Sequence, residues 1–222
     1  MYMKYILYHI SIFFFILINA TQAQVFTQDG TLVVEVKSKT GRIWMDRNLG
    51  AKQAATSSTN PASFGYLYQW GRASDGHQLR NSGTSSKLSS RDVLENGLFI
   101  LSINSPNDWF NGQSEKLWQG VNGKNNPCPK GFRLPTSLEL DAEIATWFAK
   151  NAKGAFASPL KLPMSGYRSN GNGSLTDAGL SGDYWTSTRD GLNSRGLYFD
   201  VSSAGMDAGG RACGVSVRCI KD

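Results

Sequence analysis

The sequence predicts an α+β fold made mostly of short antiparallel strands and long loops, with one clear helix. Apolar residues recur at helical spacing in one place, over residues 137–151. Elsewhere, short apolar stretches alternate with turns rich in Gly, Asn and Ser. No convincing internal period repeats along the chain. These observations favour a single sheet-and-loop domain over a helical bundle or a repeat protein.

Residues 1–23 predict a secretory signal peptide. Lys4 precedes an apolar run over residues 6–18, and the small residues Thr21 and Ala23 stand where a signal peptidase reads. The run is too short, and too sharply followed by polar residues, to span a bilayer comfortably. We therefore expect cleavage after Ala23, no later membrane span, and a secreted or cell-surface protein, with the periplasm as the other destination to consider.

The remaining residues, 24–222, suffice for one well-buried domain and are few for two. Loss of Lys4 with the signal would lower the formal net charge from +6 to +5. The positive side chains are scattered, and no basic run or basic helix occurs. The sequence therefore predicts a soluble surface with a modest positive excess, and no nucleic-acid binding.

The first expected element is a hairpin. Residues 32–36 and 42–46 read as two strands joined by the turn "KSKTG". The following section, residues 50–126, is rich in Ser, Asn and Gly but holds aromatic islands such as "YLYQW" and "DWF". Since Trp and Tyr rings normally need burial, we expect irregular but ordered structure there.

The helix is expected over residues 137–151. Thr136 and Glu139 have the spacing of a capping box, and Gly154 is expected to end the helical segment. Beyond it, four short strands are predicted between turns. They are expected within residues 160–168, 182–188, 195–202 and 214–220.

Three cysteines in an exported chain indicate one disulfide and one remaining thiol. Cys213 and Cys219 lie six residues apart in a strand-like stretch, where Val215, Val217 and Cys219 would share one face. A straight strand would separate the Cα atoms of the two cysteines by about 20 Å, against roughly 6 Å between the Cα atoms of a disulfide. A turn at Gly214 would allow that pairing; otherwise the bridge is long-range and involves Cys128.

Several motifs together carry a family resemblance. In order, "GRIWMDRNLGA", "GYLYQWGRASDGHQ", "NPCPKGFRLPT", "LKLPMSGYR", "GDYWTST" and "VSVRCIKD" closely resemble the Fibrobacter succinogenes major paralogous domain. That family is grouped with C-type-lectin-like folds and, more distantly, with formylglycine-generating enzymes. The resemblance implies a C-type-lectin-like domain whose N- and C-terminal strands lie together. It also implies a Cys128–Cys219 disulfide, with Cys213 as a free thiol.

Catalysis is not expected. The formylglycine-generating relatives resemble copper-dependent oxidases that use two close cysteines, and Cys213 alone cannot form a two-thiolate copper site. His77 is the only histidine after the signal. Arg72 and Asp75 lie near it in "GRASDGHQ", so these three residues are candidates for ligand binding; the pattern favours a polar turn held by its own side chains.

No cofactor is predicted, and calcium is left open. The Glu-Pro-Asn, Gln-Pro-Asp and Trp-Asn-Asp motifs of calcium-dependent lectins are absent, although residues 170–177 and 183–193 are rich in oxygen ligands. Trp109 and Trp118 are the candidate surface rings for stacking against a sugar. Residues 189–211 form a second candidate surface, treated as a loop before the last strand.

The sequence therefore predicts a secreted or cell-surface binding module for glycan binding or adhesion. Its expected partner is an extracellular glycan or a surface protein. Two other classes are kept as alternatives: a copper-dependent oxidase of the formylglycine-generating type, and a purely structural surface protein.

Overall fold

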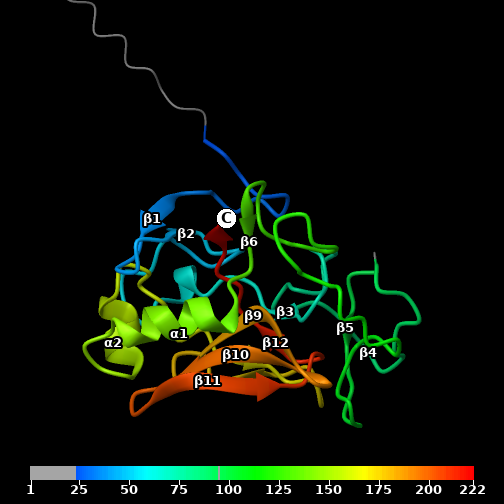
Figure 1. Ribbon diagram of the computed structural model, residues 1–222. Helices are drawn as coiled ribbons and strands as arrows, with labels where there is room; N and C mark the ends of the chain where they lie inside the picture. The colour runs from blue at the N-terminus through cyan, green and yellow to red at the C-terminus, as the bar shows by residue number, and fades with distance from the viewer. Residues whose placement is uncertain (1–23, 95) are drawn as a thin grey trace, which may run out of the picture.

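The computed structural model describes residues 24–94 and 96–222. The predicted signal peptide, residues 1–23, lies outside these residues. Within the described ranges, no helix is long and apolar enough to span a bilayer. The fold class is as predicted: short antiparallel strands in several small sheets, few helical residues, and long connecting loops (Figure 1).

The first sheet joins the two ends of the domain. The predicted N-terminal hairpin is present, with Val36 opposite Trp44, and Trp44 in turn lies opposite Ile220 near the C-terminus. N- and C-terminal strands thus lie together, as the resemblance implied. The strand order is β1-β2-β13-β6, with β1 at Glu35–Lys37, β2 at Ile43–Met45, β13 at Ile220–Lys221 and β6 at Phe132–Arg133.

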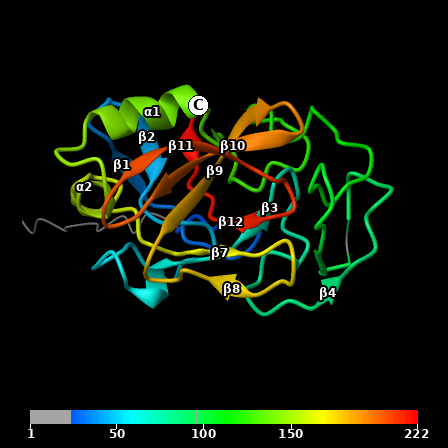
Figure 2. The same cartoon turned by 90° about the horizontal axis from the view of Figure 1, so that it is seen from below.

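The second sheet has the longest strands. Two consecutive hairpins give the order β11-β10-β9, and helix α1 packs across one face of these strands (Figures 1 and 2). The bounds are Gly182–Asp190 for β9, Asn193–Phe199 for β10 and Ala204–Gly209 for β11. Residues 189–211, expected as a loop, therefore contain most of this sheet. That expectation was wrong because Gly205, Asp207 and Gly209 mask a strand pattern.

Two further sheets are built from strands of two residues. One contains three antiparallel pairs in the order β3-β12-β7-β8, and the other is a single parallel pair, β4-β5. A short 3₁₀ helix, η1, spans Pro61–Ser63. The strands are β3 (Tyr68–Gln69), β12 (Gly214–Val215), β7 (Tyr167–Arg168), β8 (Leu175–Thr176), β4 (Thr84–Ser85) and β5 (Phe99–Ile100).

Helix α1 begins as predicted and ends early. It spans Ser137–Ala145, and the capping box of Thr136 and Glu139 is complete at its start. Asn151 then caps a second helix, α2 (Ala152–Ala157), by accepting hydrogen bonds from the backbone N–H groups of Lys153 and Gly154. The expected end at residue 151 was therefore wrong: Asn151 starts a new helix and Gly154 lies inside it.

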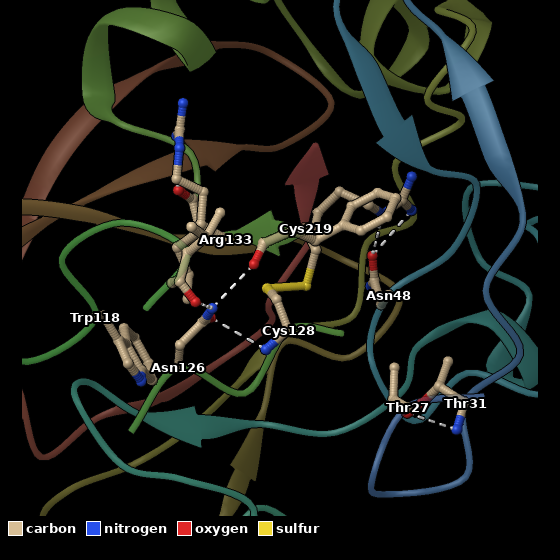
Figure 3. Close-up of a disulfide and its surroundings, with 12 residues drawn as sticks. Thr27, Thr31, Asn48, Trp118, Asn126, Cys128, Arg133 and Cys219 are labelled. Atoms are coloured by element: carbon tan, nitrogen blue, oxygen red, sulfur yellow. Dashed lines mark hydrogen bonds between the residues drawn. A yellow bond between two sulfur atoms is a disulfide. The ribbon is translucent and has the colours of Figure 1, made fainter. Parts of the chain in front are cut away.

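The disulfide implied by the resemblance is present between Cys128 and Cys219, with a Cα–Cα distance of 5.8 Å (Figure 3). Asn126 positions the first cysteine, because its Oδ1 accepts a hydrogen bond from the Cys128 backbone N–H at 3.1 Å. Cys213 is the free thiol. The bridge ties the end of the long loop region to the C-terminal segment beside the first sheet.

The predicted last strand, residues 214–220, is divided into β12 and β13. Between them the chain leaves one sheet and enters another, so both sides of the segment are covered. Ser216 and Arg218, which strand alternation places on the opposite face from Val217, are buried as thoroughly as Val217. The Arg218 guanidinium donates to Asn48 Oδ1 at 2.9 Å and to the Leu160 carbonyl at 2.6 Å.

Candidate ligand-binding site

A pocket of about 190 Å³ lies on the face of the β11-β10-β9 sheet that points away from α1. Because side chains alternate along a strand, Tyr184, Leu197 and Phe199 face the helix and join its apolar core. The neighbouring residues on these strands face the other way. The principal side chains lining the pocket are Tyr167, Asp183, Trp185, Tyr198, Asp207 and Cys213.

Glycines leave the floor of the pocket open. Gly196 lies opposite Trp185 on one side and opposite Asp207 on the other, and Gly209 stands two residues further along β11. Neither has a positive φ, so the backbone does not require glycine at either position. A Cβ on Gly209 would lie 3.3 Å from the Trp185 ring, inside the pocket. Glycine in a strand interior is typical of a place where a ligand approaches the backbone.

The aromatic residues of the pocket are held by hydrogen bonds. The Trp185 indole N–H donates to the Tyr68 carbonyl at 2.9 Å, which leaves the six-membered end of the ring beneath Gly209. The Tyr198 hydroxyl donates to Asp200 Oδ2 at 2.9 Å, while its ring stays exposed. Trp185 is 2 % exposed and forms part of the pocket wall, so the exposed Tyr198 ring is the face suited to stacking against a ring-shaped ligand.

Asp183 is the partly buried carboxylate of the site. Its Oδ2 accepts a hydrogen bond from the Ser181 hydroxyl at 2.7 Å. Burial, together with the nearby negative charges of Asp177 and Asp207, raises the pKa of Asp183 to about 6. Asp207 lies on β11, separated from β9 by β10, and is exposed. The pocket therefore presents hydrogen-bond acceptors and negative charge next to aromatic surface.

Cys213 is half-buried in the pocket wall. Its Sγ lies 3.4 Å from Asn170 Oδ1. Burial, with a smaller effect from the Asp183 charge, raises the pKa of this thiol. Since the thiolate is the nucleophilic and metal-binding form, this environment disfavours reactivity at neutral pH.

The two tryptophans expected to bind a ligand lie in the core. Trp109 is 1 % exposed and Trp118 is 0 % exposed, so neither ring has a face available for a sugar. The Trp109 indole N–H donates to the Trp70 carbonyl at 2.7 Å, and that of Trp118 donates to the Asn125 carbonyl at 2.9 Å. The expectation of surface exposure was wrong, because loop carbonyls without a strand partner draw these indoles inward.

Arg72, Asp75 and His77 do come together, but in the interior. Asp75 accepts from Arg72 at 2.5 Å and lies 2.6 Å from His77 Nδ1, while His77 Nε2 accepts from the Gln69 backbone N–H. Burial, followed by the Arg72 charge, lowers the pKa of His77 to about 4. The ring is therefore neutral at physiological pH, and this arrangement favours the structural role over ligand contact.

Sequence reasoning missed Tyr167, Asp183, Tyr198 and Asp207 as a group. The second candidate surface, residues 189–211, does contribute part of the pocket, although as strands. The available signal was the alternation of Gly and Asp in "GMDAGG", which becomes informative only once the hairpin register is known.

Over residues 24–94 and 96–222, no group of three or more His, Cys, Asp or Glu side chains is arranged to hold a metal ion.

No family model, curated protein or solved structure matches the chain. The resemblance to the major paralogous domain stays a prediction.

Proposed function

We propose that residues 24–222 form an exported, C-type-lectin-like binding module of the major paralogous type that binds a glycan in the β9–β11 pocket. The observation that carries this proposal is the combination of a glycine floor with aromatic and carboxylate side chains around it. Sugar rings stack on aromatic faces, and their hydroxyls donate to carboxylates. The module acts at the cell surface or outside the cell, in recognition or adhesion.

The pocket volume limits what is bound at one time. At about 190 Å³, it is smaller than the roughly 300–1,000 Å³ of pockets that enclose a drug-sized ligand. One ring of a longer chain fits this space, with the neighbouring rings outside it. Binding to a single pocket of this kind is weak, so adhesion would depend on several copies or several repeats of the sugar.

The test is a glycan array followed by titration of any bound glycan, using two glycine variants. Gly209→Val places methyl groups against the Trp185 ring and is expected to abolish binding. Gly205→Val is the matched control, because it lies on the same strand and a Cβ there has no atom within 4 Å. Equal binding by both variants, or no glycan bound by the unmodified protein, would contradict the proposal.

Cys213→Ser separates this function from the oxidase alternative. A binding module is expected to consume no oxygen in the presence of copper, whether residue 213 is Cys or Ser. Copper-dependent oxygen consumption that disappears in Cys213→Ser would instead identify an enzyme and overturn the binding-module proposal.

A further inference from the structure

The charge of the pocket carries information about its ligand. Two carboxylates, Asp183 and Asp207, line it, and no lysine, arginine or histidine does. Neither carboxylate takes part in an ion pair within the described ranges. This occurs in a chain with a formal net charge of +6, where basic groups are in excess.

An uncompensated carboxylate in a half-buried pocket is unfavourable, because burial removes water without supplying a positive partner. The elevated pKa of Asp183 has this origin. A cation placed between Asp183 and Asp207 would offset the cost. The exposed Tyr198 ring favours the same charge, since the face of a Tyr ring attracts ammonium groups.

Resting on the proposed function, we propose that the pocket selects sugars that carry a protonated amine, such as a glucosamine unit, over neutral sugars of the same shape. The amine lies between Asp183 and Asp207, and the sugar ring lies over the glycine floor beside Tyr198. The amine forms a charge-assisted hydrogen bond with one carboxylate and is attracted over a longer distance by the other, which lies two strands away.

The shape of the site favours an amino sugar over a lysine side chain. A lysine presents its ammonium at the end of a thin chain, which suits a narrow channel. This site is a shallow hollow, with Gly196 and Gly209 across its floor and exposed ring surface at Tyr198. Such a floor accommodates a ring lying flat.

Three β-1,4-linked tetrasaccharides make a matched ligand series: those of glucosamine, N-acetylglucosamine and glucose. They share a backbone and differ at carbon 2. Titration just above pH 6, where Asp183 is mostly ionised, and at low salt, followed by NMR chemical shifts, is expected to show the glucosamine tetramer binding about tenfold more tightly than the other two. Added salt is expected to reduce this preference.

Asp207→Asn tests the carboxylate directly, since Asp207 is exposed and its replacement leaves the core untouched. The variant is expected to bring the glucosamine tetramer close to the neutral tetramers, whose affinity is unchanged. Asp190→Asn is the matched control: it removes the same charge from the same sheet, at a hairpin end outside the pocket. It is expected to leave all three affinities unaltered.

The outcomes separate the two proposals. Equal affinity for the three tetramers overturns the amine preference and leaves glycan binding standing. Absence of binding by all three in the unmodified protein, with no other glycan bound on the array, overturns both. Nα-acetyl-lysine amide serves as a further probe. If it binds and the glucosamine tetramer does not, the sugar class is wrong and a protein ligand is indicated.

Discussion

The loop region, residues 50–126, and the β9–β11 sheet satisfy the hydrogen bonds of their backbones in different ways. In the loop region, side chains supply the hydrogen bonds that strands would otherwise provide. Gln69 Nε2 donates to the Ile100 and Ala212 carbonyls, both at 2.7 Å, and Asn125 Nδ2 donates to the Gly71 carbonyl at 2.8 Å. The indoles of Trp109 and Trp118 do the same.

In the sheet, the backbone pairs with itself. Strands β10 and β11 are in register over six residue pairs, from Ser194–Gly209 to Phe199–Ala204. The carbonyls of these strands therefore need no side chains from the open face as hydrogen-bond partners. Glycine and aspartate can occupy that face without loss of hydrogen bonds between the strands.

The comparison shows where a ligand site can arise in this molecule. The loop region contains many polar and aromatic side chains, but they are committed to holding the chain together. The sheet contains few, and the two carboxylates on its open face, Asp183 and Asp207, form no ion pair within the described residues. Aromatic content alone therefore selects buried rings, whereas the unpaired carboxylates beside glycine select the pocket proposed to bind a ligand.

The largest expected effect comes from breaking the covalent link at the end of the loop region. Cys128→Ser with Cys219→Ser removes a bridge that spans 91 residues and is expected to lower the free energy of unfolding by about 4 kcal/mol. Urea unfolding followed by tryptophan fluorescence measures it. Cys213→Ser is the control and is expected to change stability by less than about 1 kcal/mol. Identical midpoints for the unmodified protein with and without reductant would contradict the prediction.

Local signals in the sequence predicted local structure well. The capping box at Thr136 and Glu139 predicted the start of α1, and alternation around the "KSKTG" turn predicted the first hairpin. Each depends on residues that are close in the chain. The disulfide came from the family resemblance, because spacing alone left all three pairings of the cysteines open.

The end of α1 and the pocket could not be predicted in the same way. Trp147 and Phe148 continue the helical spacing, yet Phe148 is 65 % exposed and the chain turns to start α2. The pocket depends on register: Gly196 faces Asp207 only because two hairpins align three strands. Such alignment is set by tertiary packing and leaves no short sequence motif.

The pH dependence of stability is expected to have opposite signs in the two regions. His77, in the loop region, has a pKa of about 4, below the ordinary 6.5, so the unfolded chain takes up its proton first and stability falls as pH falls. Asp183, in the sheet, has a pKa of about 6, above the ordinary 3.8, so the folded state takes up its proton first and stability rises.

Two variants separate these contributions between pH 6 and pH 4.5. The lower limit is the ordinary pKa of Glu139, because below it the stabilising contribution of the Glu139 carboxylate is also lost. The two effects largely cancel in the unmodified protein. In His77→Gln, stability is expected to rise by about 1.5 kcal/mol as pH falls through this window, and in Asp183→Asn to fall by about the same amount. Urea unfolding at several pH values measures both slopes. Parallel slopes in the two variants would contradict the comparison.

The smallest expected effect compares an indole N–H group of the loop region with one that packs against the sheet from outside it. Trp109 is bonded to the Trp70 carbonyl, whereas Trp147, which packs against Phe199 of β10, has an indole N–H without a partner among the described residues. Both rings are buried, so Trp→Phe removes similar volume at each. Trp109→Phe also leaves a buried carbonyl unpaired, and is therefore expected to cost about 1 kcal/mol more than Trp147→Phe in urea unfolding. An equal or larger loss at Trp147 would show that indole–carbonyl bonds do not hold the loop region together.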